Sequence, residues 1–248
     1  LGNNTTASNN TAVGKSALGA NTTGTNNTAV GINAAKSNTT GGIDAIGRDA
    51  GRSNTTGSGN LAVGETAFYS NTTGAGNTAI GREALYTNTT GTHNTVVGYA
   101  SNYSSTGSNN ATFGYNSHPS AGSSNNQITL GNTSNDNLRC NDTSISSLSD
   151  ARDKTNVQDI PLGLDFVNQM RPVSFDWDRR DGSYKGRKDF GFIAQELKEI
   201  QDNTAYAAHM RLVQEDNPEK LEADPMKTYP VLVKAIQELS AKVEELQT

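Results

Sequence analysis

Hydrophobic and polar positions in the N-terminal half follow one short repeat. In most copies a β-branched or aromatic residue stands directly before a glycine. These glycines are 16 or 17 residues apart throughout: Gly14, Gly31, Gly47, Gly64, Gly81, Gly98, Gly114 and Gly131. A second glycine series keeps the same phase, mostly within Asn-Thr-Thr-Gly: Gly24, Gly41, Gly57, Gly74, Gly91 and Gly107. Two glycine series in a fixed phase predict stacked, nearly identical units.

Each unit predicts one short strand that ends at its glycine. The residues before these glycines are Val13, Val30, Ile46, Val63, Ile80, Val97 and Phe113, and 127–131 is a degenerate eighth copy. Most units place a small residue three positions after the glycine, where close packing requires it: Ala17, Ala34, Ala50, Ala67 and Ala84. Glycine permits turns with positive φ, and Asn and Thr form polar ladders. We therefore expect residues 1–133 to form a β-solenoid or β-roll-like shaft.

A single chain of this composition is poor in core residues. Only 33% of the 248 residues are hydrophobic and 6% are aromatic. Identical chains around one axis would turn each Val or Ile position into a layer of a shared core. The pattern favours a homotrimeric shaft, although the repeat itself does not count the chains.

The pattern changes in the C-terminal segment. Apolar positions in 161–170 predict a short helix that ends at Pro172. Alternation before and after a charged tip predicts a hairpin over 172–194, with the tip either solvated or acting as an arm onto the shaft or a neighbouring chain. A helix follows to about Ile200, and residues 205–223 are weakly patterned.

The last element carries a heptad stripe. From Val231 onward the apolar residues are spaced 4, 3, 4, 3, in this order: Leu232, Ile236, Leu239, Val243 and Leu246. This spacing is typical of a coiled coil, but two heptads are too short to be stable alone. We therefore expect a trimeric coiled-coil helix supported by an α+β domain.

Composition also changes at Leu148–Ser149. Residues 1–148 hold 21 of the 25 glycines and six charges of each sign, whereas residues 149–248 hold 14 basic and 19 acidic residues. No basic run or membrane-length apolar run is present, which argues against nucleic acid and a membrane span. The sequence predicts no cofactor or metal site, since Cys140 is the single cysteine and His93 and His118 lack partners at ligand spacing. Without an initiator Met or signal peptide, the chain reads as part of a longer protein.

Five short motifs then carry a resemblance to a known family. They are Ser149-Asp150-Ala151-Arg152-Asp153-Lys154, Gly163-Leu164, Arg171-Pro172-Val173-Ser174-Phe175-Asp176-Trp177, Gly191-Phe192-Ile193-Ala194-Gln195-Glu196 and Ala235-Ile236-Gln237-Glu238-Leu239. In this order, 149–248 resembles the C-terminal intramolecular chaperone of phage endosialidases, tail fibres and appendage proteins, with a loose match over 201–224. The resemblance implies a domain that trimerises, folds the preceding fibre and cuts itself off through a Ser-Lys dyad.

Carried over by motif, the nucleophile is Ser149, the base is Lys154 and the cut falls between Leu148 and Ser149. A serine hydroxyl needs a base, and a lysine can be that base where desolvation lowers its pKa. Spacing alone does not establish the pair, because Ser183 and Lys188 are equally far apart. Asp150 and Arg152 are candidate supporting residues, as orienting groups or as a surface ion pair.

The resulting hypothesis has three domains and two rivals. Residues 1–133 are the shaft, 134–148 a connector and 149–248 a chaperone that acts once as a serine endopeptidase. The resemblance implies a place in the virion, a chaperone released in the host cytoplasm during assembly, and a host-cell receptor bound by the shaft or by residues N-terminal to it. One rival is a trimeric adhesin stalk with a permanent C-terminal cap. A turnover enzyme on host glycan lacks a catalytic carboxylate pair in the repeats.

Overall fold

The computed structural model describes residues 2–135, 137–140, 147–180, 182 and 184–247. The chain divides into two compact units, Leu1–Asn137 and Leu138–Thr248. Part of the predicted connector, residues 136 and 141–146, lies outside the described residues, as do Asp181 and Ser183 of the hairpin tip.

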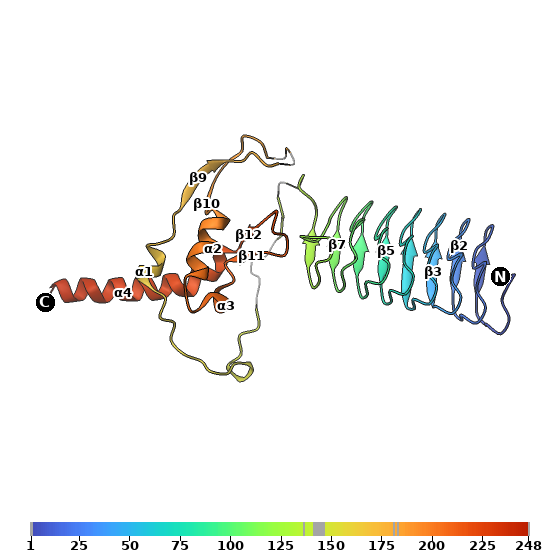
Figure 1. Ribbon diagram of the computed structural model, residues 1–248, viewed down its shortest axis with the longest axis horizontal. Coiled ribbons are helices and arrows are strands. Elements are labelled where there is room, and N and C mark those ends of the chain that lie inside the picture. The colour runs from blue at the N-terminus through green and yellow to red at the C-terminus, as the bar shows by residue number, and fades with distance from the viewer. Residues whose placement is uncertain (1, 136, 141–146, 181, 183, 248) are drawn as a thin grey trace. The chain divides into compact units, whose positions relative to one another are not determined.

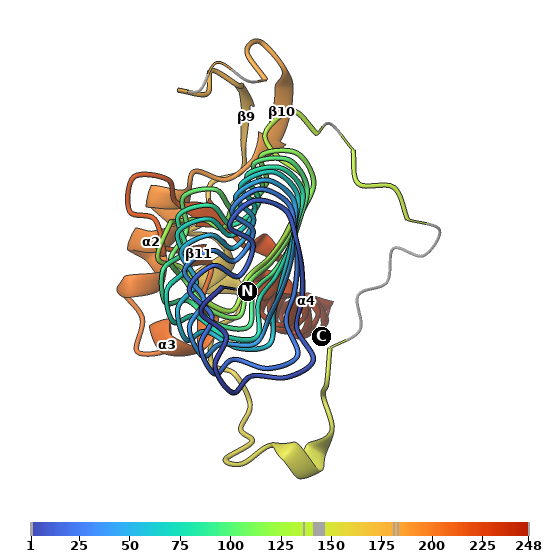
Figure 2. The same ribbon diagram turned by 90° about the vertical axis from the view of Figure 1, so that its right-hand side faces the viewer.

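The first unit is a parallel β-solenoid, as the repeat predicted. Each coil contributes one strand to a single sheet in which neighbours in sequence are neighbours in space (Figure 1). The strands are β1 (Thr11–Val13), β2 (Thr28–Val30), β3 (Ile43–Ile46), β4 (Asn60–Val63), β5 (Thr78–Ile80), β6 (Thr95–Val97), β7 (Ala111–Phe113) and β8 (Ile128–Leu130). Viewed along the stack, the coils superimpose closely (Figure 2). The register pairs equivalent residues of successive repeats, for example Val63 with Ile80.

The closing glycines are required by the approach of neighbouring coils. Gly64 has a φ of +131°, and a Cβ built on it would lie 2.6 Å from the carbonyl oxygen of Gly81. An L residue would be strained there and would collide with backbone that cannot move aside. The regular spacing of these glycines therefore reflects both the turn geometry and the close contact between neighbouring coils.

The interior of the solenoid is built from small apolar rows and asparagine ladders. Its core contains the alanines in the middle of most strands and those three residues after the closing glycines. Asn71 donates from Nδ2 to Oδ1 of Asn54 in the preceding coil at 2.6 Å. In a second ladder Oδ1 of Asn77 accepts the backbone N–H of Asn94 at 3.0 Å. These bonds satisfy amides that are otherwise buried at a cost.

A paired exchange keeps the interior filled in the third coil. Ile43, in strand β3, stands at the position that pairs with Asn60 of strand β4. Gly51 occupies the row held by Phe68 and Leu85 in later coils, and a Cβ on Gly51 would lie 2.5 Å from Cδ1 of Ile43. In the third coil the side chain of Ile43 thus fills the space that Phe68 and Leu85 fill in later coils, which maintains close packing.

The residue before each closing glycine points outward. These residues pair in register across the eight strands: Val13, Val30, Ile46, Val63, Ile80, Val97, Phe113 and Leu130. Val13, Ile46, Ile80, Phe113 and Leu130 are exposed, whereas Val30, Val63 and Val97 are half-buried. We call this set the outer apolar row. The interior of one chain uses the alternate strand positions, and the prediction that the outer apolar row forms a core shared between chains stays a prediction.

The second unit is a small α+β body with a long C-terminal helix. Its elements are a 3₁₀ turn η1 (Ala151–Asp153), α1 (Leu164–Val167), β9 (Val173–Asp176), β10 (Lys188–Gly191), α2 (Ala194–Asp202), α3 (Ala207–Met210), β11 (Val213–Gln214), β12 (Glu222–Ala223), a 3₁₀ turn η2 (Pro225–Thr228) and α4 (Tyr229–Gln247). Strands β9 and β10 form the predicted antiparallel hairpin. A core centred on Phe166, Leu197 and Leu212 joins α1 and α2 to the segment after α3. Among the described residues, none of the helices combines the length and apolar character needed to cross a bilayer.

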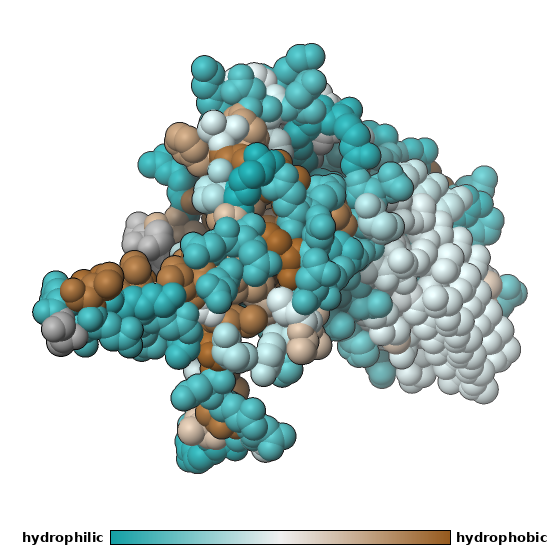
Figure 3. All heavy atoms as spheres, turned by 60° about the vertical axis from the view of Figure 1, so that its left-hand side comes forward, coloured by the Kyte–Doolittle hydropathy of each residue, from teal (hydrophilic) through white to brown (hydrophobic). Residues whose placement is uncertain are grey.

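Helix α4 has two different apolar faces. Val231 and Ala235 are buried against the rest of the unit. The heptad residues Ile236, Leu239, Val243 and Leu246 are exposed, Ile236 at 67% and Leu246 at 87%. Figure 3 shows them as part of a brown row along the helix. We call Leu232, Ile236, Leu239, Val243 and Leu246 the heptad stripe.

Candidate functional site

A short capped turn holds the Ser149 motif. The side chain of Asp150 accepts a hydrogen bond from the backbone N–H of Arg152 at 2.8 Å and caps η1. The backbone N–H of Lys154 closes the turn onto the carbonyl of Ala151 at 3.2 Å. Aspartate is among the preferred residues for such a cap. The turn reverses the chain, so residue 154 returns toward residue 149.

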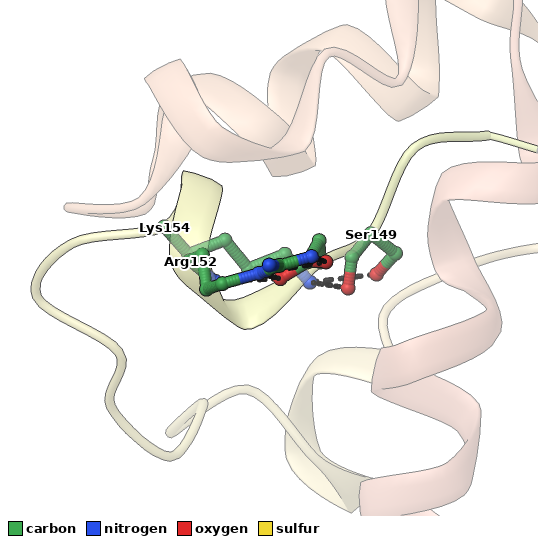
Figure 4. A network of polar contacts seen from close by, with 4 residues as sticks. Ser149, Arg152 and Lys154 are labelled. Atoms are coloured by element: carbon green, nitrogen blue, oxygen red, sulfur yellow. Dashed lines mark hydrogen bonds and ion pairs between the residues drawn. The ribbon is translucent and has the colours of Figure 1, made fainter.

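Ser149 and Lys154 are in contact in this turn. Nζ of Lys154 donates to Oγ of Ser149 at 2.6 Å and to the Ser149 carbonyl oxygen at 3.1 Å (Figure 4). The structure thus brings together the two residues that the motif singled out, within the distance expected of a nucleophile and its base. Leu148, on the other side of the candidate bond, is 85% exposed.

Asp150 and Arg152 form a bidentate ion pair beside this contact. Nε of Arg152 donates to Oδ1 of Asp150 at 3.0 Å, and Nη2 donates to Oδ2 at 2.7 Å. The bonds from the Arg152 side chain and backbone lower the pKa of the Asp150 carboxyl, and the carboxylate raises the pKa of Arg152. Asp150 is therefore held ionised, as an acceptor for the η1 cap.

Ser149 and Lys154 are both exposed in one chain. A lysine becomes a good base when burial disfavours its charged form. The single chain supplies the contact between the two groups and leaves both exposed to solvent.

The other motifs contact one another in pairs. Oε2 of Glu238 accepts the backbone N–H of Leu164 at 2.7 Å, at the start of α1. A Cβ on Gly163 would lie 2.3 Å from that carboxylate oxygen, so glycine leaves room for it. Nε of Arg171 donates to Oε2 of Glu196 at 3.1 Å. All five residues lie within the motifs found in the sequence, but no role was predicted for them.

Cys140 and His93 are exposed, and His118 is half-buried with Nε2 2.9 Å from Oδ1 of Asn116. Within the described ranges no group of three or more His, Cys, Asp or Glu side chains is placed to hold a metal ion. The pair Ser183–Lys188 cannot be compared with Ser149–Lys154, because Ser183 is outside the described residues.

Comparison with known proteins finds one family match, which lies in the second unit. Residues 149–206 match the model of a peptidase family described as chaperone of endosialidase. No curated protein and no solved structure matches the chain significantly. The match begins at Ser149 and covers the capped turn, the Gly163-Leu164 motif and the Arg171–Glu196 pair. Residues 149–206 of this chain are therefore similar to the chaperone of endosialidase family.

Proposed function

We propose that residues 149–248 assemble three copies of the chain, register their shafts, and then cut each chain once between Leu148 and Ser149. Ser149 is the nucleophile and Lys154 is the base. The observation that carries the proposal is the 2.6 Å contact between Nζ of Lys154 and Oγ of Ser149 at the first residue of the family match. The family supports a phage tail-fibre type of protein with a chaperone domain.

Two apolar rows at the surface, each with exposed and half-buried members, support assembly with further copies. The outer apolar row runs along all eight strands of the solenoid, and the heptad stripe runs along α4. Contiguous exposed apolar rows of this kind mark interaction surfaces. Both rows repeat with a fixed register, which suits parallel contact with identical chains around an axis.

The two faces of α4 separate folding of one chain from assembly. Val231 and Ala235 are buried within the unit, and Glu238 accepts the N–H of Leu164. The heptad stripe lies outside these contacts. One chain can therefore hold the helix in place while the stripe stays available to two partners.

The cleavage chemistry follows from the position of Ser149. Its hydroxyl and the Leu148 carbonyl carbon belong to adjacent residues, so the attack closes a five-membered ring and needs no substrate binding. Lys154 accepts the hydroxyl proton as Oγ bonds to the carbonyl carbon. The C–N bond breaks, the Ser149 nitrogen takes a proton and becomes the new N-terminal amine, and an ester links Leu148 to Oγ. Water then hydrolyses the ester to the Leu148 carboxylate and the free Ser149 hydroxyl.

Assembly is what makes this site reactive. The dyad is exposed in one chain, and Lys154 acts as a base only when it is desolvated. Neighbouring chains of the trimer supply that burial, so cleavage follows registration. The rival, a permanent cap, predicts the same trimer and no cut.

A denaturing gel of freshly expressed protein tests the cut. We expect wild type to give two fragments and both Ser149→Ala and Lys154→Ala to leave the full 26.1 kDa chain. Ser147→Ala and Lys220→Ala are matched controls that should cut normally. Sequencing should find Ser149 at the N-terminus of the smaller fragment. A wild-type chain that trimerises but stays whole would favour the permanent cap.

A further inference from the structure

The apolar interior of the solenoid ends at Val96. The coils before it bury aliphatic and aromatic side chains. The structure describes all of residues 98–135, and none of them belongs to the apolar core of the solenoid. The residues buried beyond this point include Ser101, Asn102, Ser105, Asn110, Thr112, Ser117 and Ser124. The last coils keep the in-register strand pairing of the earlier ones but have a largely polar interior.

The change occurs row by row. Ser101 takes the position of Ala84, three residues after the closing glycine. Asn102 takes the position of Leu85, and Thr112 pairs with Val96 across the sheet. Each exchange removes apolar surface from the interior, which is the main favourable contribution to stability.

The polar replacements are only partly satisfied. Oγ of Ser101 lies 3.0 Å from Oγ1 of Thr112. Neither Nδ2 nor Oδ1 of the fully buried Asn102 has a hydrogen-bond partner among the described residues, and Oδ1 of Asn88 in the preceding coil also has none. Buried amides without partners destabilise the fold that holds them.

We infer that the coils from Gly98 to Gly131 are the least stable part of the shaft and open before the rest. On the proposed function, these are also the coils next in sequence to the domain that registers the chains. The part of the shaft with the most polar interior is thus the part that precedes this domain in the chain, and its opening increases when the chain is cut. Stability in a solenoid is a sum over coils and their neighbours, so such a weak end opens without unravelling the remainder.

Hydrogen exchange with peptide-level mass spectrometry tests the inference on the full chain. In uncut Ser149→Ala protein, amides of 98–131 should exchange at least about tenfold faster than those of 43–97. After wild-type cleavage the exchange of 98–131 should become faster still, while 43–97 stays unchanged.

An interior-restoring variant gives the sharper result. In the Ser149→Ala background, Ser101→Ala with Asn102→Leu extends the alanine and leucine rows. Leucine is suited to this position because Leu85, at the equivalent position of the preceding coil, already has a positive φ. Its φ is 53°, close to the 48° of Asn102. We expect exchange across 98–131 to slow by about tenfold or more. Ser104→Ala, exposed in the same coil, is the control and should change nothing.

The inference that 98–131 is the least stable part would be overturned if amide exchange were equal along the shaft. It would also be overturned if exchange in the restored variant were as fast as in its parent. Unchanged exchange in 98–131 after the cut would overturn its dependence on the C-terminal domain. If wild type is never cut, the proposed function has failed, yet the gradient and the restored variant still decide whether the end is weak.

Discussion

The carboxylate of Glu238, on the last helix, caps the backbone N–H of Leu164, 74 residues earlier, at 2.7 Å. Gly163 leaves space for this contact, since any side chain there would meet the carboxylate. The helix that carries the heptad stripe is thereby tied to the segment that follows the Ser149 turn. This hydrogen bond adds to the apolar packing of Val231 against Phe166, which also joins α4 to α1.

Replacing Glu238 tests this connection. Glu238→Ala leaves the half-buried Leu164 N–H without its acceptor, and we expect the free energy of unfolding of the C-terminal unit to fall by about 1–3 kcal/mol. Urea denaturation followed by the far-UV signal measures it. Glu244→Ala, exposed on the same helix, is the control, and equal effects of the two would contradict the capping role.

Asp150 is expected to position the dyad through the η1 cap. Asp150→Ala should slow cleavage by about tenfold, because the turn that returns Lys154 to Ser149 loses its cap. Asp150→Asn keeps a capping oxygen and should restore most of the rate. The measurement is the time course of fragment appearance on a denaturing gel, with the trimer fraction followed in parallel. Equal slowing by Asn and Ala would point to the charge instead of the cap.

The outer apolar row is expected to lie inside the assembled shaft. Ile80→Asp places one charge per chain in this row, and we expect the concentration at which the shaft dissociates to rise at least about tenfold. Light scattering over a dilution series measures this. Thr90→Asp, exposed and outside the row, should leave the mass at three chains. An Ile80→Asp shaft as stable as wild type would exclude the row from the interface.

Cutting is expected to remove the route back to the folded shaft. The repeats are nearly alike, so unregistered chains can pair one coil out of step with little change in local contacts. After denaturation and dilution, uncut Ser149→Ala protein should recover its trimer, whereas cut wild type should not. Equal recovery would remove the chaperone role.

The Arg171–Glu196 pair predicts a definite response to acid. The bond from Arg171 lowers the pKa of Glu196 below its usual value. Because the folded-state pKa is lowered, the pair adds stability above the ordinary glutamate pKa of about 4.3, and that stability is lost as the pH falls through the lowered value. An NMR titration should show the Glu196 pKa rise in Arg171→Ala, and an unchanged value would contradict the pairing.

The regular parts of the fold could be predicted because their causes are local. The regular spacing of the glycines predicts the coils. The alternation of apolar and polar residues around Phe175 and Phe190 predicts the β9–β10 hairpin. The predicted helix over 161–170 is shorter in the structure, since α1 spans only Leu164–Val167. Helix α3 and the two-residue strands β11 and β12 were missed, because elements so short have no period to detect.

Which positions form the interior of one chain could not be predicted from hydrophobicity. Most Val and Ile residues before the closing glycines lie at the surface, whereas the interior combines rows of alanine with a few large side chains such as Leu18, Phe68 and Leu85. The exchange of Ile43 and Gly51 depends on two residues meeting across the coil, which only coordinates reveal. At the site, the motif gave Ser149 and Lys154 and named Asp150 without its capping role, whereas the Glu238 contact joins residues 74 apart and has no signal at sequence level.

Because the coils stack in register, the number of coils in the shaft can change without changing the rest of the fold. Coils of 16 and 17 residues occupy equivalent places in the same sheet. Duplicating one of them within the gene adds one strand, about 4.8 Å of reach, and offers the same neighbours above and below. The distance this protein spans can therefore change in discrete steps over generations while its cross-section, its outer apolar row and its C-terminal domain stay as they are.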